Sequence, residues 1–137
     1  MGKEKIKLKI ITHEKIVFDK EVDEITLQGT KGRFGVLPNH INIVSALDIG
    51  VTKAVIEGKN EFITTMGGIF KFNNNNATIL TDTAEMGSDV DIVRARTKKE
   101  QIEARLKAHD ITPDEFNKAQ ISLAKAIARL KAGERSS

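Results

Sequence analysis

The feature that most limits the fold of this chain is a series of short β-prone runs that fills its first 84 residues. Residues 5–10 alternate strictly, which places Ile6, Leu8 and Ile10 on one face and three lysines on the other. That pattern is typical of a half-buried antiparallel strand. Eight further runs follow at close intervals, over residues 16–18, 25–28, 34–37, 41–47, 51–56, 61–65, 69–72 and 77–80. The spacing predicts an antiparallel sandwich or flattened barrel, and the lack of helical patterns between the runs disfavours a parallel α/β sheet.

Turn-forming residues separate these runs. Glycine or asparagine occurs in the segments 29–32, 48–50, 57–60 and 67–68. Four consecutive asparagines stand at 73–76. Because asparagine tolerates a positive φ, this short run predicts a hairpin turn rather than a low-complexity segment.

Composition divides the chain into two parts. Residues 1–84 hold eight of the ten glycines and four alanines, whereas residues 85–137 hold two glycines and eight alanines. This shift predicts a β-sandwich domain over residues 1–86 and a helical hairpin over residues 87–137. The last 53 residues carry few large apolar side chains, so the hairpin would be marginal as an isolated unit. The predicted fold class is therefore mainly β plus α, an antiparallel sandwich of about ten strands followed by two helices.

The first predicted helix begins near Ser88 and Asp91, which have the spacing of an N-terminal cap after Gly87. Its apolar stripe is narrow and consists of Ile92, Ala95, Ile102 and Leu106. After a link at residues 109–111, a stronger start signal follows. Thr112 provides a cap, Pro113 suits the first helical position, and Glu115 completes a capping box.

The second predicted helix has an equally thin stripe and ends near Gly133, which suits a C′ position. Its stripe consists of Phe116, Gln120, Leu123, Ile127 and Leu130. Two thin stripes predict a hairpin that holds together weakly and can open or dock again. Between residues 117 and 133 the helix carries cations and no acid, namely Lys118, Lys125, Arg129 and Lys131. Two interpretations stay open: a solvated face whose cations suit the helix C-terminus, or a strip that docks on an acidic surface of another protein.

Charge and residue types exclude several classes of function. The 22 basic and 19 acidic residues give a net charge of +3, and the only aromatics are six phenylalanines. This balance disfavours a dedicated nucleic-acid binder. There is no cysteine, no apolar run near the ~20 residues of a bilayer span, and no apolar segment that would indicate a signal peptide. No signal peptide, transmembrane segment, disulfide or thiolate metal site is therefore expected.

A search for catalytic chemistry also gives a negative expectation. The three histidines, His13, His40 and His109, lack the spacing of a metal site and fall in predicted turns. Nucleophile elbows, Walker loops and dinucleotide fingerprints are missing from the sequence. Carboxylates cluster at the domain junction, where caps and solvent contacts explain them: Asp82, Glu85, Asp89 and Asp91. We expect no catalytic residue and no metal ligand.

Four stretches, in this order, resemble the epsilon chain of the F-type (F1Fo) ATP synthase. They are Gly32-x-Phe34-Gly35-Val36-Leu37-Pro38-Asn39-His40, Gly67-Gly68, Leu80-Thr81-Asp82-Thr83-Ala84-Glu85 and Asp91-Ile92-Val93-Arg94-Ala95. The resemblance spans essentially the whole chain. It implies a ten-stranded β-sandwich followed by a two-helix hairpin, in agreement with the pattern described above.

The resemblance implies a non-catalytic subunit of the central stalk. The sandwich would bind the rotating gamma chain and rest on the membrane ring of c subunits, on the cytoplasmic face of the bacterial cell membrane. The segment 31–40 matches the one that this family presents to the ring, which nominates Lys31, Gly32, Arg33, Phe34, Gly35, Pro38, Asn39 and His40. His40 is the residue of this segment that we most expect to contact a partner.

The resemblance also implies regulation by the hairpin. In bacterial members the hairpin extends beside gamma and blocks ATP hydrolysis by contacting acidic segments of the alpha and beta subunits. Lys118, Lys125, Arg129 and Lys131 would then stabilise the extended, inhibitory state. Some members bind ATP in the folded hairpin with a motif similar to residues 90–95, which nominates Glu85, Asp91, Arg94, Ala95 and Arg129 as ATP ligands.

No cofactor is required by these interpretations, and ATP would act as a regulatory ligand. The leading hypothesis is a rotor subunit that couples ring rotation to gamma and inhibits hydrolysis. The alternatives are a nucleotide-sensing module, or a generic β-sandwich scaffold with a helical partner-binding tail.

Overall fold

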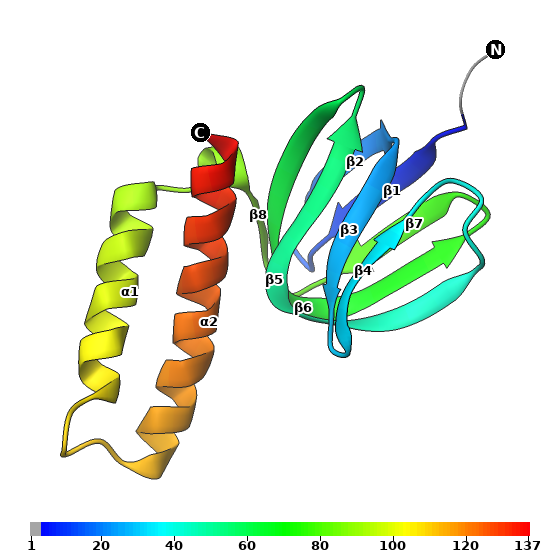
Figure 1. The fold of residues 1–137 in the computed structure, drawn as a ribbon. Coiled ribbons are helices and arrows are strands. Elements are labelled where there is room, and N and C mark those ends of the chain that lie inside the picture. The colour runs from blue at the N-terminus through cyan, green and yellow to red at the C-terminus, as the bar shows by residue number, and fades with distance from the viewer. Residues whose placement is uncertain (1–3) are drawn as a thin grey trace.

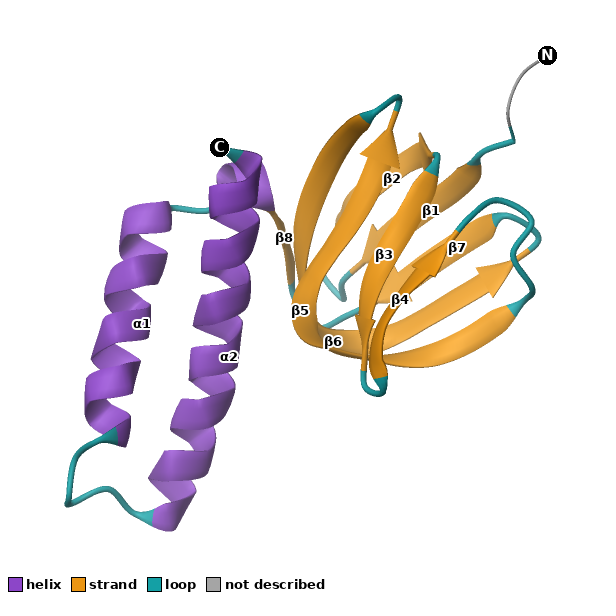
Figure 2. Ribbon diagram, in the orientation of Figure 1, coloured by secondary structure: helices purple, strands orange, loops and turns teal. Residues whose placement is uncertain are grey.

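The structure is a computed structural model that describes residues 4–137, so the first three residues of the expected sandwich domain lie outside it. A β-sandwich is followed by two antiparallel helices, as Figures 1 and 2 show. The strands are β1 (Ile6–Ile11), β2 (Ile16–Val22), β3 (Glu24–Gly29), β4 (Gly32–Val36), β5 (Ile43–Ile56), β6 (Lys59–Asn73), β7 (Asn76–Leu80) and β8 (Ala84–Met86). A 3₁₀ turn, η1 (Gly87–Asp89), leads to α1 (Ile92–Leu106) and α2 (Pro113–Ser136). The predicted fold class is confirmed.

The strands form one hydrogen-bonded path in the order β2-β1-β7-β6-β5-β3-β4, and β8 pairs with β6. Strands β5 and β6 are long and strongly bent, so that a single path folds over into the two layers of the sandwich (Figure 1). The alternating side chains Ile6, Leu8 and Ile10 are fully buried between the layers, as their spacing predicts. Phe70 and Phe72 of β6 stack on each other at the centre of the same core.

Two predicted turns are bends within strands, so the structure has eight described strands rather than about ten. The segments 48–50 and 67–68 lie inside β5 and β6, which stay paired on both sides of them, as Leu47 with Gly68 and Ile49 with Met66. Gly67 and Gly68 have φ of 79° and 120°. A side chain on Gly68 would also collide with the backbone of Leu80 in β7. Glycine here permits a sharp bend against a neighbouring strand without ending the ladder.

One pairing departs from the antiparallel pattern that the sequence predicts. Strand β1 runs parallel to β7, with Lys7 opposite Asn76 and Ile11 opposite Leu80. A parallel pair requires a long crossover connection. Here the connection consists of the five strands between β1 and β7, rather than a helix.

Helix α1 begins one turn later than Ser88. Asp91 is its N-cap, and the Asp91 carboxylate accepts a hydrogen bond from the Arg94 backbone N–H at 3.0 Å. Ser88 lies instead in η1. The Thr112 cap of α2 is confirmed, because its hydroxyl accepts from the Glu115 N–H at 3.1 Å and Pro113 is the first helical residue. The Glu115 carboxylate accepts from the Thr112 hydroxyl at 3.2 Å, in place of the bond from the Thr112 backbone N–H that a capping box would make.

The prediction that α2 ends near Gly133 is wrong. The helix continues to Ser136, and Gly133 is buried inside it. A Cβ at Gly133 would lie 2.9 Å from Cγ1 of Ile92 and 3.1 Å from Cγ1 of Val90. This glycine therefore serves the close approach of α2 to the start of α1 and does not terminate the helix.

The hairpin is folded against the sandwich. Helix α2 lies between α1 and the sandwich (Figure 1), and it contacts β5, β6 and η1. Most of its buried residues are small: Ala126, Ala128, Ala132 and Gly133. The alanine-rich character that the sequence predicts for α2 is thus found at its buried surface. The predicted stripe is wrong, because Phe116 and Gln120 are exposed and Leu123, Ile127 and Leu130 are only partly buried.

Candidate functional site

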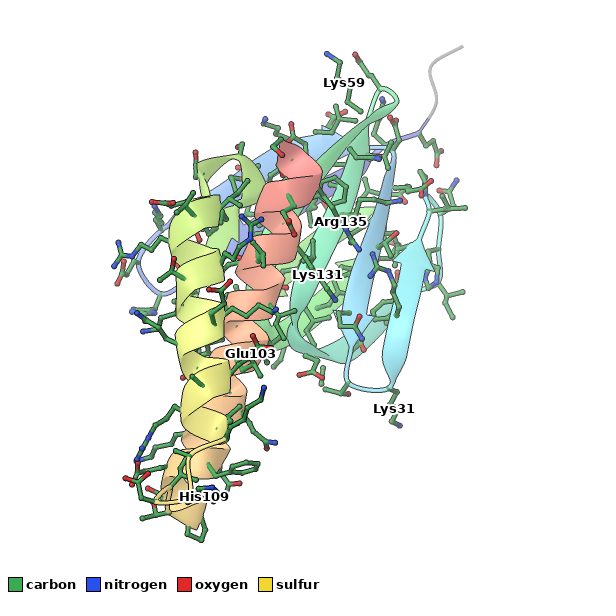
Figure 3. The ribbon with its side chains drawn as sticks, turned by 60° about the vertical axis from the view of Figure 1, so that its left-hand side comes forward. Lys31, Lys59, Glu103, His109, Lys131 and Arg135 are labelled. Carbon is green, nitrogen blue, oxygen red and sulfur yellow. The ribbon has the colours of Figure 1, made fainter. Side chains whose placement is uncertain are left out.

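The segment 31–40, predicted as one interface loop, is divided by a strand. Residues 32–36 form β4, so Lys31 lies at the tight β3–β4 turn and residues 37–40 lie at the opposite end of the strand. Five strand residues span about 16 Å. Figure 3 shows Lys31 at the tip of that turn. The predicted interface residues therefore occupy two separate corners of the sandwich.

Side chains within β4 have different surroundings. Phe34 packs edge-on against Phe70, with ring centroids 6.0 Å apart, and belongs to the core. Arg33 is exposed and lies directly opposite Gln28 of β3. Gly35 is exposed, and a Cβ there would meet only the Ile25 carbonyl oxygen at 3.8 Å. Of these three residues, Arg33 is the one with an exposed side chain.

The corner at residues 37–40 is held by the asparagine turn. Asn39 has a φ of 68°, and its backbone N–H donates to Oδ1 of Asn75 at 2.7 Å. The Asn75 amide donates back to Oδ1 of Asn39 at 3.1 Å. Asn74 and Asn75 have φ of 49° and 63°, so they form the predicted hairpin turn with positive φ between β6 and β7. Sequence reasoning missed that this turn also supports the neighbouring loop 36 residues away.

His40 is fixed rather than free. Its Nδ1 lies 2.8 Å from the Ile41 carbonyl oxygen, to which it donates, and its ring meets Phe72 edge-on at 5.9 Å. Pro38 precedes it in a turn closed by the His40 N–H on the Leu37 carbonyl at 3.1 Å. Beside His40, Leu37 and Ile41 are 58% and 78% exposed.

A row of apolar residues crosses the outer face of the sandwich. Directly paired residues carry it across five strands, in the order Ile16, Ile11, Leu80, Ile69 and Ala46. Their chain neighbours Ile10, Ile79 and Phe70 are fully buried, so alternation turns this outer row away from the core. Ile16, Leu80 and Ile69 are each about half exposed, at 53%, 51% and 51%. Large contiguous apolar patches on a protein surface are typical of interaction sites.

The residues nominated as ATP ligands are partly brought together. Nε of Arg129 on α2 lies 2.9 Å from Glu85 on β8, an ion pair between the hairpin and the sandwich. Asp91 is occupied as the N-cap of α1, and Ala95 is fully buried in the helical seam. Arg94 is exposed and has no ion-pair partner among residues 4–137.

The four cations of α2 do not share one face. At 100° per residue, Lys118, Lys125 and Arg129 fall within about 40° of one another, whereas Lys131 lies on the other side of the helix. Lys118 pairs with Asp114 at 3.1 Å, and both side chains are 78% exposed. Figure 3 shows Lys131 and Arg135 on α2 beside the sandwich. The strip predicted from the sequence is therefore divided between solvent and the α2–sandwich boundary.

Further ion pairs hold the hairpin closed. Arg96 of α1 pairs with Glu134 of α2 at 3.1 Å. At the other end Arg105 pairs with Glu115 at 2.6 Å and with Asp110 at 3.1 Å. The hydrogen bond from Arg105 lowers the pKa of Glu115, with a second contribution from Thr112, and the same contact raises the pKa of Arg105.

Among residues 4–137, no three histidine or carboxylate side chains gather in a group that suits a metal ion. Within the same residues, neither helix is long and apolar enough to cross a bilayer.

Comparison with known proteins agrees with this architecture. Residues 5–87 match the model of the ATP synthase delta/epsilon chain β-sandwich domain, and residues 88–134 match that of the long α-helix domain of the same chain. A protein named ATP synthase epsilon chain from Desulfitobacterium hafniense (strain Y51) is 38% identical over 91% of this chain and 93% of its own length. One of the same name from Syntrophobacter fumaroxidans is 39% identical over 96% of this chain and 98% of its own.

Solved structures share the fold. A chain of the Euglena gracilis mitochondrial ATP synthase assembly of OSCP, F1 and c-ring superposes with a TM-score of 0.81 and 22% identity, over 95% of this chain and 81% of that one. A chain of the Tetrahymena thermophila mitochondrial ATP synthase central stalk and c-ring gives 0.58 and 12%, over 97% and 99%. Because two family models account for both parts of the chain and close relatives span nearly all of it, this protein belongs to the ATP synthase delta/epsilon chain family.

Proposed function

We propose that this chain is a non-catalytic subunit of the central stalk of an ATP synthase, peripheral to the membrane on its cytoplasmic side. The observation that carries the proposal is the outer apolar row, on a sandwich whose relatives are epsilon chains. A surface of this kind is costly to leave in water, and a permanent partner would cover it. We assign the row to the gamma chain, which would rotate together with this subunit.

The corner at residues 37–40 suits contact with the ring of c subunits. Leu37 and Ile41 are exposed there, while the asparagine bonds and the His40–Phe72 contact keep the backbone in place. A corner that is already ordered loses less conformational entropy when it docks than a flexible loop does, so it binds its partner more tightly.

Binding to gamma can be tested with a charge placed in the row. Ile69→Glu buries a carboxylate in the proposed interface and should abolish co-purification with gamma, because an unpaired buried charge costs several kcal/mol. Ile121→Glu is the matched control, since Ile121 on α2 is 53% exposed against 51% for Ile69. Equal retention of gamma by both variants would contradict the assignment of the row.

Inhibition of ATP hydrolysis is the second element of the proposal. The folded hairpin rests on small residues and a few ion pairs, so it is suited to undock and extend toward the alpha and beta subunits. Lys118, Lys125, Arg129 and Lys131 would then meet acidic surfaces, once Arg129 has left Glu85. Truncation after Asp110 should raise the ATPase activity of the reconstituted complex, and unchanged hydrolysis would rule out this role.

ATP as a regulatory ligand is the second candidate function. The guanidinium of Arg94 favours it, because within residues 4–137 it has no ion-pair partner. Arg94 and Arg129 would supply charge for the phosphates, with Glu85, Asp91 and Ala95 around the nucleoside. Binding would have to compete with the Glu85–Arg129 ion pair and with the capping role of Asp91. Calorimetry of the full chain with ATP tests this directly, and Arg94→Gln should remove the heat of binding if the assignment is right.

A further inference from the structure

A cleft of about 320 Å³ lies between α2 and the sandwich, on the side of α2 that carries Lys131. Its sandwich wall includes Gln28, Arg33 and Asp48, and its helical wall includes Lys131 and Arg135. Apolar residues such as Ile49 and Ile127 form the rest of the lining. None of these residues belongs to the set nominated for ATP.

The charges in this cleft are unbalanced. The cleft is lined by three cations and one carboxylate, so its formal charge is +2. The cations are Arg33, Lys131 and Arg135, and the carboxylate is that of Asp48. Asp48 accepts a hydrogen bond from the Ile49 N–H at 2.8 Å. Within residues 4–137, no ion pair neutralises any of the three cations, whereas Arg96, Arg105 and Arg129 are each paired with a carboxylate.

The backbone of β3, β4 and β5 leaves room in the cleft for the side chain of Gln28. Arg33 and Gln28 are directly paired across β3 and β4, so their side chains share the face toward α2. Gly50 of β5 makes room for Gln28, because a Cβ on Gly50 would lie 2.8 Å from Cβ of Gln28. The Gln28 amide makes no hydrogen bond within the described part of the chain, so its N–H₂ group can donate to a ligand.

We propose that this cleft binds a small oligophosphate, of which inorganic pyrophosphate is the simplest form. Two guanidinium groups and an ammonium supply charge-assisted donors that suit phosphate oxygens, and the Gln28 amide adds a neutral donor. The volume of the cleft is about 320 Å³. Its size falls at the lower end of small-ligand sites, which are about 300–1,000 Å³.

The site exists only while the hairpin is folded, because its cations come from both parts of the chain. Without an anion, the like charges of Arg33, Lys131 and Arg135 weaken the docking of α2. A bound oligophosphate removes this repulsion and links β4 to α2, so it should stabilise the folded hairpin by mass action. Binding itself does not depend on the proposed role in an ATP synthase.

The proposal is tested by calorimetry of the full-length chain with sodium pyrophosphate at low ionic strength. We expect saturable binding, and the double substitution Lys131→Gln with Arg135→Gln should weaken it about tenfold or more, because hydrogen bonds from two charged groups are lost. Arg33→Gln, on the sandwich side, should also weaken it. The matched control is Lys98→Gln with Lys107→Gln, which removes the same charge from two exposed positions, one in α1 and one at its C-cap. This control should change the affinity less than about twofold.

Amide chemical shifts of the ¹⁵N-labelled chain provide the second measurement and need no variant to fold. Pyrophosphate should shift amides of residues 28, 33 and 48–51 together with those of residues 124–135. Absence of saturable heat, equal weakening in the cleft and control variants, or shifts centred on Arg94 and Glu85 would each overturn the assignment. The last result would identify the ligand with the nucleotide site instead.

Discussion

Adding a single methyl group at Gly87 should weaken the docking of the hairpin on the sandwich. Gly87 is buried in η1, where β6, α2 and the domain junction meet. A Cβ there would collide with the Ser136 hydroxyl and would lie 2.5 Å from the Ala132 carbonyl oxygen and 2.9 Å from that of Phe62. Two of these atoms are backbone, one on each side of the seam. Gly87→Ala can therefore be accommodated only if α2 moves away from β6.

The magnitude follows from two opposing terms. Replacing glycine with alanine restricts the unfolded chain, which favours the docked state by about 0.4–1 kcal/mol where the native geometry permits it. Overpacking costs about 1–3 kcal/mol, and contacts with backbone oxygens fall at the upper end because such atoms do not change rotamer. The net loss of docking free energy is then about 1–2 kcal/mol, which is a factor of about 5–30 in the docking equilibrium.

Native-state hydrogen exchange measures this equilibrium. In Gly87→Ala, amides in the last three turns of α2 should exchange about 5–30-fold faster, whereas amides of β1 and β7 should keep their protection. Gly35→Ala is the matched control, because its Cβ would meet only one atom, at 3.8 Å. That control should change exchange in α2 by no more than about twofold.

Unchanged exchange in α2 would contradict this prediction, because it would mean that the seam accommodates the methyl group without undocking. Equal acceleration in β1 and β7 would also refute it, because the substitution would then destabilise the whole domain. In the assembled complex, an undocked hairpin should inhibit ATP hydrolysis more strongly if the proposed function is right.

Two further changes probe the ends of the molecule. Because the hydrogen bond from Arg105 lowers the pKa of Glu115, that carboxylate stabilises the hairpin above its unfolded pKa, and the stabilisation is lost as the pH falls through the lower, folded value. Glu115→Gln should therefore reduce the dependence of the hairpin's stability on pH, as measured by thermal melts between about pH 3 and pH 6. An unchanged dependence on pH would contradict a role for the Arg105–Glu115 ion pair. Asn75→Gly keeps the positive φ of the turn but removes the bonds to Asn39. It should lower the stability of the sandwich by about 1 kcal/mol and loosen residues 37–40 in hydrogen exchange, while Asn75→Ala, which also strains the backbone, should cost more.

Local patterns predicted most of the fold because they depend on near neighbours in the chain. Alternation from Ile6 to Ile10, the helix cap at Thr112 and the positive φ of Asn74 and Asn75 are decided within a few residues, and the structure confirms all three. The predicted turns at 48–50 and 67–68 failed for the converse reason. Whether a glycine ends a strand or bends it depends on the strand beside it, here β7 against Gly68.

The candidate sites show the same difference between features set by local sequence and features set by tertiary contacts. The sequence alone determined a β-sandwich, two capped helices, the family to which they belong and the excess of cations on α2. Only the tertiary structure decided that β4 separates Lys31 from His40, that Arg129 is held by Glu85, and that Lys131 faces Arg33 across a cleft. Gly87 and Gly133 likewise owe their roles to packing. The physical reason is that periodicity fixes which face of an element is apolar, whereas the partners of a side chain depend on contacts between residues far apart in the chain.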